Sequence, residues 1–373
     1  MEEKKWKEYP ELEYFFCQIE GVGFRTLKKL FDAVPNLEKA YELSQKQMEE
    51  LLGTKAAELI AERRKQGDPL QMWKQLRQQE ILFASYWNPS YPKDLRCIQD
   101  PPKALYALGK MPAAEERRVA LIGARACSEY GRRMARTLGE ELAGQGVVVV
   151  SGMARGIDGI SQRYALEAGG TSYAVLGCGV DICYPKENRV LYEKLCRQGG
   201  VLSEYVPGTE AKAHLFPPRN RIISALSDVI VVVEARKKSG TIITVDMALE
   251  QGKEVMVVPG RVGDGLSDGC NDLLRQGASP VLETADILRT LGIERETERN
   301  RKQQGTLSEL SGEEKLLYEL LDEYPRSIDE LARELIYRRE EMEYSQLCRI
   351  FHSLCRKGMA RQEGNTHFVK VKS

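Results

Sequence analysis

Several features are scarce in this sequence of 373 residues, and each scarcity narrows the possible functions. Only 3 histidines are present, and none of the 9 cysteines belongs to a Cys-x-x-Cys pair. The paired ligands of a structural zinc site are therefore missing, and we expect free thiols and no bound metal. Lysine plus arginine and aspartate plus glutamate both total 55. Any surface that binds an anion must therefore be a local one.

Long apolar runs are also absent. No segment approaches the roughly 18 apolar residues that a membrane-spanning helix requires. The first residues, Met1 to Lys7, are mostly charged and lack the apolar core of a secretory signal peptide. We therefore expect a cytoplasmic protein without membrane contact.

The sequence does contain a series of short β-branched runs, separated by segments of helical length. The runs are 119–122, 147–150, 173–176, 229–233 and 255–258. Uninterrupted runs of this kind predict an α/β domain with a parallel sheet that is buried on both faces. In such sheets ligands bind at the carboxyl ends of the strands, so we expect the binding crevice there.

Loops rich in glycine and basic residues follow these runs, and we expect them at 123–125, 151–158, 177–179 and 216–221. Glycine lets main-chain N–H groups approach an anion, and helices that begin after the loops add partial positive charge. The dinucleotide motif Gly-x-Gly-x-x-Gly is incomplete, because Ile182 follows Gly177 and Gly179 where a third glycine belongs. Several separate phosphate-sized sites suit a polyanion better than one cofactor, and we expect no cofactor. The candidate binding residues are Gly123, Arg125, Ser151, Gly152, Arg155, Gly156, Gly177, Gly179, Lys186, Lys212, Phe216, Arg219, Asn220, Arg221, Ser239, Gly240 and Thr241.

Several of these residues have more than one interpretation. Arg125 directly follows an apolar strand, where a buried charge would be costly, so we expect it to point into the crevice. Phe216 fits either the core or a platform on which a base stacks. One of Arg219 and Arg221 is equally suited to an ion pair with a glutamate at a strand end, Glu204 or Glu234.

Two residues are expected to cap helices. Asp158 precedes a predicted helix and fits its N-cap, where it would orient the loop without contacting an anion. Ser239 opens the next helix and fits the same position, with main-chain N–H groups beside it for a phosphate.

Four segments of the chain together resemble a known family. They are Ser-Gly-Met-Ala-Arg-Gly-Ile-Asp (151–158), Phe-Pro-Pro-Arg-Asn-Arg (216–221), Ser-Gly-Thr (239–241) and Pro-Gly (259–260), after a lead-in with Asp-Pro-Pro (100–102). In this order and spacing they resemble the DNA-processing protein A (DprA, also called Smf) family over about residues 86–283. Ala124 stands where the family usually has serine, and Ser161-Gln162 where it usually has Ala-His.

The resemblance implies an extended Rossmann-like domain in a protein without enzymatic activity. Such a protein would bind and protect incoming single-stranded DNA, form a homodimer and load RecA recombinase during natural transformation. The alternative is a nucleoside-monophosphate phosphoribohydrolase of the lysine-decarboxylase-like family, which has a catalytic glutamate shortly after a similar Gly-Thr. Here Gly240 and Thr241 are followed by Thr244, which favours binding over catalysis.

The flanking regions predict two further domains. Residues 1–82 have helical periodicity, and Gly21-Val22-Gly23 between two helices resembles a helix-hairpin-helix turn. We favour an ordinary helical hairpin without DNA contact, because Glu20 and Asp32 dilute the local positive charge. Together with the family resemblance, this predicts a helical domain resembling a sterile-alpha-motif domain. Residues 83–291 form the Rossmann-like domain, and the polar residues 292–312 a linker.

Residues 313–373 predict three helices and a β-hairpin, the pattern of a winged helix. Ser327 and Glu330 have the spacing of a capping box at the start of its second helix. From Tyr344 onward six lysines and arginines accompany a single glutamate, Glu363. Contact with duplex DNA or with a protein is therefore open for this domain.

Overall fold

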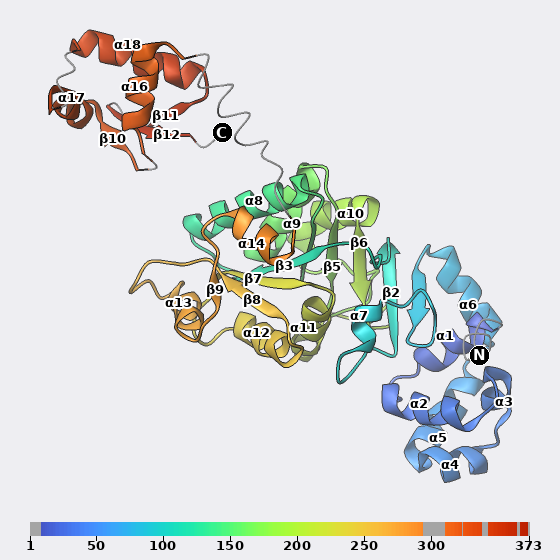
Figure 1. Cartoon of the computed structure of the whole chain (residues 1–373). Coiled ribbons are helices and arrows are strands. Elements are labelled where there is room, and N and C mark those ends of the chain that lie inside the picture. The colour runs from blue at the N-terminus through green and yellow to red at the C-terminus, as the bar shows by residue number, and fades with distance from the viewer. Residues whose placement is uncertain (1–8, 294–309, 323, 338–341, 364–365, 372–373) are drawn as a thin grey trace. The chain divides into compact units, whose positions relative to one another are not determined.

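The computed structural model describes residues 9–293, 310–322, 324–337, 342–363 and 366–371 (Figure 1). The chain divides into two compact units, residues 1–293 and 294–373. The predicted linker at 292–312 lies largely outside the described residues, and the boundary predicted after residue 82 stays a prediction. No helix in the described residues has the length and apolar character needed to cross a membrane.

A nine-stranded sheet forms the centre of the first unit, in the order β1-β2-β6-β5-β4-β3-β7-β8-β9. From β6 to β9 all neighbouring strands are parallel, whereas β1 and β2 add an antiparallel edge. The α/β class and the parallel sheet predicted from the β-branched runs are thus confirmed. The strands are β1 (Leu82–Ser85), β2 (Ala104–Gly109), β3 (Arg118–Gly123), β4 (Val148–Ser151), β5 (Ser172–Val175), β6 (Gly200–Ser203), β7 (Val229–Glu234), β8 (Glu254–Val257) and β9 (Ser279–Pro280).

Helices cover both faces of this sheet (Figure 1). In β3, Val119 and Leu121 pack into one core while Ala120 and Ile122 pack into the opposite one, as the two-residue period of a strand requires. The first face carries α8 (Glu129–Gly144), α9 (Ile157–Glu167), α10 (Arg189–Gln198) and α14 (Thr284–Thr290), and the second α11 (Phe216–Ala225), α12 (Gly240–Glu250) and α13 (Asp268–Arg275). Short helical turns, α7 (Lys93–Arg96), η1 (Lys186–Asn188) and η2 (Ala213–Leu215), complete the connections.

One predicted loop is helical. Residues 216–221 are expected from the sequence to form a loop, but they are the first turns of α11, with Pro217 and Pro218 at its start. Proline is well tolerated in the first turn of a helix, because its missing N–H would have no partner there. Arg219 and Arg221 therefore lie on a rigid helix, which fixes their directions.

The N-terminal residues form helices, as their periodicity predicts. They are α1 (Pro10–Cys17), α2 (Phe24–Ala33), α3 (Leu37–Glu42), α4 (Gln45–Leu52), α5 (Thr54–Lys65) and α6 (Pro69–Gln78). The turn between α1 and α2 is held by Lys103 of the segment before β2, whose ammonium donates to the carbonyl oxygens of Ile19 and Val22, each at 2.7 Å. The carbonyls of this glycine-rich turn are thus committed to a contact within the chain.

The second unit contains α16 (Gly312–Leu320), α17 (Ile328–Tyr337) and α18 (Tyr344–Arg356). Its three-stranded sheet has the order β10-β12-β11, with β10 (Arg326–Ser327), β11 (Ala360–Glu363) and β12 (His367–Lys370). The expected capping box is present, because the N–H of Glu330 donates to Ser327 Oγ and the N–H of Ser327 to the Glu330 carboxylate. Stacked rings of Phe351 and Phe368, 4.8 Å apart, join α18 to the hairpin in one core.

Candidate functional site

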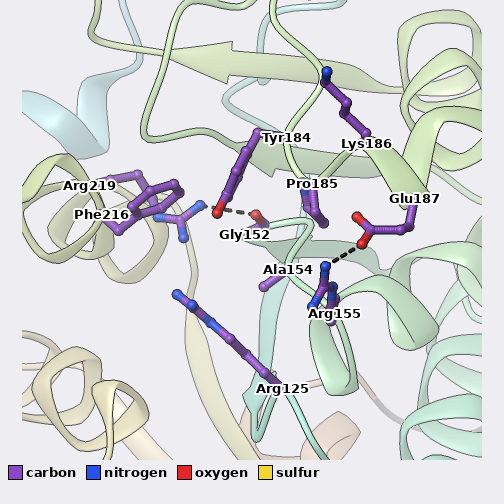
Figure 2. Close-up of a pocket in the computed structure, with 10 residues that line it drawn as sticks. All are labelled: Arg125, Gly152, Ala154, Arg155, Tyr184, Pro185, Lys186, Glu187, Phe216 and Arg219. Carbon is purple, nitrogen blue, oxygen red and sulfur yellow. Dashed lines mark hydrogen bonds and ion pairs between the residues drawn. The ribbon is translucent and has the colours of Figure 1, made fainter. Parts of the chain in front are cut away.

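A pocket of about 340 Å³ lies beyond the carboxyl ends of β4 and β5 (Figure 2). The loops that follow different strands meet there, as expected for a parallel sheet. Its lining consists of Arg125, Gly152, Ala154, Arg155, Tyr184, Pro185, Lys186, Glu187, Phe216 and Arg219.

Arg219 forms one wall of this pocket, although it is only 4% exposed. Its guanidinium donates to the carbonyl oxygen of Gly152 at 3.1 Å and also to that of Val175, at the end of β5. Burial lowers the pKa of Arg219 to about 10, against the opposing effect of the Asp158 carboxylate. The side chain remains charged at neutral pH, and no carboxylate of the described residues lies within ion-pair distance of it. A buried cation held only by carbonyl oxygens is well suited to meet an anion.

Gly152 makes room for this arginine. A Cβ atom at position 152 would lie 2.6 Å from two nitrogens of the Arg219 guanidinium. The glycine was predicted to let its N–H reach a ligand, but that N–H donates to Asp158 Oδ2 at 3.2 Å. Gly152 therefore acts on the site by the space that it leaves open.

Phe216 lies between two guanidinium groups. The Cζ atoms of Arg125 and Arg219 are 6.0 and 5.8 Å from its ring centroid, within the range of cation–π contacts. The ring of Tyr184 is tilted toward it, with centroids 5.3 Å apart. Figure 2 shows Arg125 directed toward Arg219 and Phe216. This half-buried ring thus lines the pocket, and its role as a platform for a base stays a prediction.

The loop between β4 and α9 is held in place by hydrogen bonds from neighbouring elements. The N–H of Met153 donates to Gln162 Oε1 at 3.0 Å, and Asn188 Nδ2 donates to the Met153 carbonyl at 2.8 Å. Gly156 has a φ of +74°, and a Cβ there would lie 2.2 Å from the carbonyl oxygen of Ala124. Only glycine fits this close crossing of two loops.

Asp158 does not cap α9, contrary to the expectation. It lies inside the helix, whose N-cap is Gly156, and its carboxylate accepts the Gly152 N–H. Burial raises the pKa of Asp158, while the positive charge of Arg219 lowers it. The residue orients the loop, as predicted, but from a different position.

The rim of the pocket is more exposed. Arg155 forms an ion pair with Glu187 in which both side chains are largely exposed. The exposed side chain of Lys186 extends away from Arg125 and Arg219 (Figure 2). A carboxylate thus stands among the cations of the rim.

Arg221 takes the other role foreseen for this pair of arginines. Its guanidinium donates to both carboxylate oxygens of Glu204, at 2.7 and 2.8 Å, and to the Asp100 carbonyl at 2.9 Å. The expected ion pair with Glu204 is therefore present. Asn220, the residue between the two arginines, accepts a hydrogen bond from Arg219 Nε at 3.1 Å.

Ser239 lies at the N-cap position of α12, but its side chain makes no capping hydrogen bond. Its buried hydroxyl has no hydrogen-bond partner in the described part of the chain. The predicted cap is therefore wrong, and the hydroxyl is left beside the first N–H groups of α12.

The pocket therefore gathers six of the predicted residues, Arg125, Gly152, Arg155, Lys186, Phe216 and Arg219. The remaining candidates do not line it: Gly123, Ser151, Gly156, Gly177, Gly179, Lys212, Asn220, Arg221, Ser239, Gly240 and Thr241. Gly177 supports it indirectly, because a Cβ there would lie 2.9 Å from Phe216. Tyr184 and Glu187 were not among the candidates. The sequence did contain a signal for them, because residues 184–187 follow strand β5 and combine an aromatic residue, Tyr184, with a basic one, Lys186.

The strand order and this pocket define the class of the protein. The order β5-β4-β3-β7-β8 is that of a Rossmann-like doubly wound sheet, and its crevice is cationic and aromatic. The chain belongs to the DNA recombination-mediator protein A family, whose model matches residues 82–292.

Named relatives agree with this assignment. The chain is 34% identical to the DNA processing protein DprA of Streptococcus pneumoniae over 276 residues, which are 74% of this chain and 96% of the relative. It is 44% identical to the protein Smf of Escherichia coli over 202 residues, 54% of each.

Solved structures of the family have the same fold. The crystal structure of Streptococcus pneumoniae DprA matches with a TM-score of 0.66 at 34% identity, covering 75% of this chain and 97% of that one. The DNA processing protein A of Helicobacter pylori matches with a TM-score of 0.52 at 33% identity, covering 57% and 95%. The latter structure is described as showing a unique single-stranded DNA binding mode.

Proposed function

We propose that this chain binds single-stranded DNA in the pocket beyond β4 and β5. The carrying observation is the buried cation Arg219 without a carboxylate partner, beside the ring of Phe216. A phosphate satisfies the guanidinium, and an unpaired base stacks on the aromatic ring. Because the bases of a duplex already stack on one another, this combination favours a single strand. The Helicobacter pylori relative, whose structure matches 57% of this chain, supports the assignment.

The strand extends beyond the pocket in this proposal. Lys212 is exposed in the connection before α11, and Ser239 stands at the N-cap position of α12. Gly240 and Thr241 contribute the first N–H groups of that helix, which has the positive end of its dipole there. These positions supply phosphate contacts that carry no base information.

The biological role follows from the family. We infer a mediator of DNA recombination that protects incoming single strands, forms a homodimer, and transfers the strand to RecA in natural transformation. The family match supports the recombination role. RecA loading and dimerisation rest on the family resemblance alone.

We propose binding without turnover. The position that would carry the catalytic glutamate of the phosphoribohydrolase alternative holds Thr244, which is buried in α12 and donates to the Gly240 carbonyl. Glu187 is the one carboxylate among the residues that line the pocket in the described chain, and it pairs with Arg155. No free acid and base therefore face one another in the pocket. Release of a free base from a nucleoside monophosphate by the purified protein would contradict this proposal.

The flanking regions are proposed to be a sterile-alpha-motif-like helical domain and a winged helix. The element order α16-β10-α17-α18-β11-β12 supports the latter. In a winged helix, α18 would lie in a major groove, and it bears Arg349 and Arg356. Removal of residues 300–373 should leave affinity for short oligonucleotides nearly unchanged and weaken binding of long ones, because only long ones reach both sites. Equal, large losses for both lengths would identify the second unit as the main single-strand site.

The pocket is tested by removing its accessible cations. Arg125→Ala and Lys186→Ala should each weaken binding of unrelated single-stranded sequences and reduce the slope of log K against log salt by about 0.7. Arg197→Ala is the matched control, because Arg197 is exposed at the opposite end of α10 from the pocket side. Fluorescence anisotropy at two or more salt concentrations measures the effect. Unchanged affinity in both pocket variants would refute the site.

A further inference from the structure

Next to the pocket, the end of β3 has the parts of a second phosphate site. β3 ends at Gly123, and α8 begins directly after its N-cap Ser128. The connection after β3 leads to α8 on one face of the sheet, and that after β7 leads to α12 on the other. In doubly wound sheets this change of direction opens a crevice, and nucleotide phosphates bind there at the first helix N-terminus.

Glu234 occupies this position. It is the last residue of β7, lies beside Gly123 and is only 1% exposed. The main-chain N–H of Ser128 donates to Glu234 Oε2 at 2.7 Å, and Ser128 Oγ donates to Oε1 at 2.5 Å. The Gly131 N–H donates in turn to Ser128 Oγ at 3.0 Å. Both carboxylate oxygens are thus bound by the N-terminus of α8.

The groups around the Glu234 carboxylate are those that would bind a free anion, namely an N–H and a hydroxyl at a helix N-terminus. No lysine or arginine of the described residues lies within ion-pair distance of Glu234. Its negative charge faces the helix N-terminus, which stabilises anions. A Cβ at position 131 would lie 2.8 Å from Glu234 Oε2, so Gly131 leaves the space that the carboxylate fills.

We propose that Glu234 is a specificity-determining residue, an internal anion that excludes the phosphates of mononucleotides and dinucleotides from the α8 N-terminus. Phosphates are thereby confined to the neighbouring pocket around Arg219, where, under the proposed function, they belong to a DNA strand. The connection from β3 to α8 has no glycine between Gly123 and Ser128. This lack of a glycine-rich turn and the occupied helix terminus then have one explanation, because Glu234 fills the position that a nucleotide phosphate takes in other doubly wound sheets.

The test is to remove the carboxylate and offer inorganic phosphate in its place. Glu234→Ala removes the carboxylate and leaves the Ser128 N–H and hydroxyl without it. Glu234→Gln is the matched control, because its neutral amide still fills the space. Both are made together with Arg125→Ala and Lys186→Ala, which reduce phosphate binding in the pocket. Calorimetry should then show one additional phosphate per chain in Glu234→Ala but not in Glu234→Gln, and phosphate should raise the melting temperature of Glu234→Ala selectively.

The reference protein carries Arg125→Ala and Lys186→Ala but keeps Glu234. Equal phosphate binding and equal thermal shifts in this protein and in both Glu234 variants would overturn the proposal and leave Glu234 as a helix cap only. Should Glu234→Ala not fold in plain buffer, Glu234→Ser and refolding in phosphate decide the question. Recovery of the fold by phosphate supports the proposal, and failure of both variants with and without phosphate refutes it. Binding of single-stranded DNA is measured separately on the unsubstituted protein. Failure of the proposed DNA site in the pocket is thereby distinguished from failure of the proposed role of Glu234.

Discussion

Two regions of the first unit bury charged side chains in opposite ways. In the pocket, Arg219 donates only to neutral oxygen atoms and faces open space. In a second region, which we term the seam and define by Glu13, Lys103, Glu204 and Arg221, the charged side chains lie away from the pocket and two of them form an ion pair. Arg221 stands two residues after Arg219 on the same helix, yet it has a bidentate ion pair with Glu204.

The other residues of the seam are also engaged. Lys103 donates to the turn between α1 and α2, and burial lowers the pKa of its ammonium. Glu13 of α1 accepts a hydrogen bond from Ser85 at the end of β1. The seam thus joins the N-terminal helices to the sheet by hydrogen bonds and one ion pair, and none of its four charged side chains lines the pocket. A buried ion pair such as that of Arg221 and Glu204 holds elements in place, whereas a buried cation that lines a pocket and has no ion pair marks a place for an anionic ligand.

The largest expected effect is on stability and lies in the seam. Arg221→Ala leaves the half-buried carboxylate of Glu204 without its partner and should cost about 3 kcal/mol of unfolding free energy, the lower end of the range for buried ion pairs. Single-strand affinity of the folded protein should stay the same. Urea unfolding and anisotropy measure the two quantities, and the double variant with Glu204→Gln should recover part of the loss. Loss of DNA affinity without loss of stability would mean that Arg221 binds DNA and does not serve the fold.

A pH effect in the seam comes next. Burial raises the pKa of Glu13 from its usual 4.5 to about 7, partly offset by the hydrogen bond from Ser85. Because the folded-state pKa lies above the unfolded one, stability is full below about pH 4.5 and falls as the pH rises toward 7, by about 3 kcal/mol. Glu13→Gln should remove this slope, as urea unfolding at about pH 5 and pH 8 would show. An equal slope in the variant would assign the pH dependence to other groups.

In the pocket, the aromatic ring should matter less than the seam ion pair. Phe216→Leu keeps an apolar side chain but loses the stacking platform, so each stacked base should lose about 1–3 kcal/mol of binding. Phe216→Tyr keeps a ring and should retain most of the affinity. Binding of short single-stranded oligonucleotides measures the difference. If leucine binds as tightly as phenylalanine, the ring is a core residue only.

The smallest effect is expected at the rim. Glu187 competes with DNA phosphates for Arg155, because the two side chains form an exposed ion pair. Glu187→Gln should tighten single-strand binding about two- to fivefold at low salt, with a smaller gain at high salt. Glu193→Gln on α10 is a suitable control, since Glu193 pairs with Arg189 away from the pocket lining. Weaker binding by Glu187→Gln would mean that Glu187 positions Arg155.

Much of this molecule follows from local patterns in the chain. The β-branched runs predict the parallel strands, because only strands buried on both faces are apolar at consecutive positions. Their order along the chain places Arg125, Gly152 and Phe216 at one edge of the sheet, and the pocket contains all three. The capping box of Ser327 and Glu330 is equally local, since both partners lie within one helical turn.

The tertiary structure alone decided which buried charged side chain faces the pocket and which forms an ion pair. Residues two apart on a helix point in nearly opposite directions, but the docking of α11 determines that Arg219, and not Arg221, faces the pocket. Gly152 leaves room for a guanidinium that is 67 positions away, and Glu234 reaches a helix N-terminus 106 positions away. Such contacts depend on how strands and helices pack, and no periodicity of the chain encodes them. The sequence thus determines where anions can approach the sheet, and packing determines which of those positions is open.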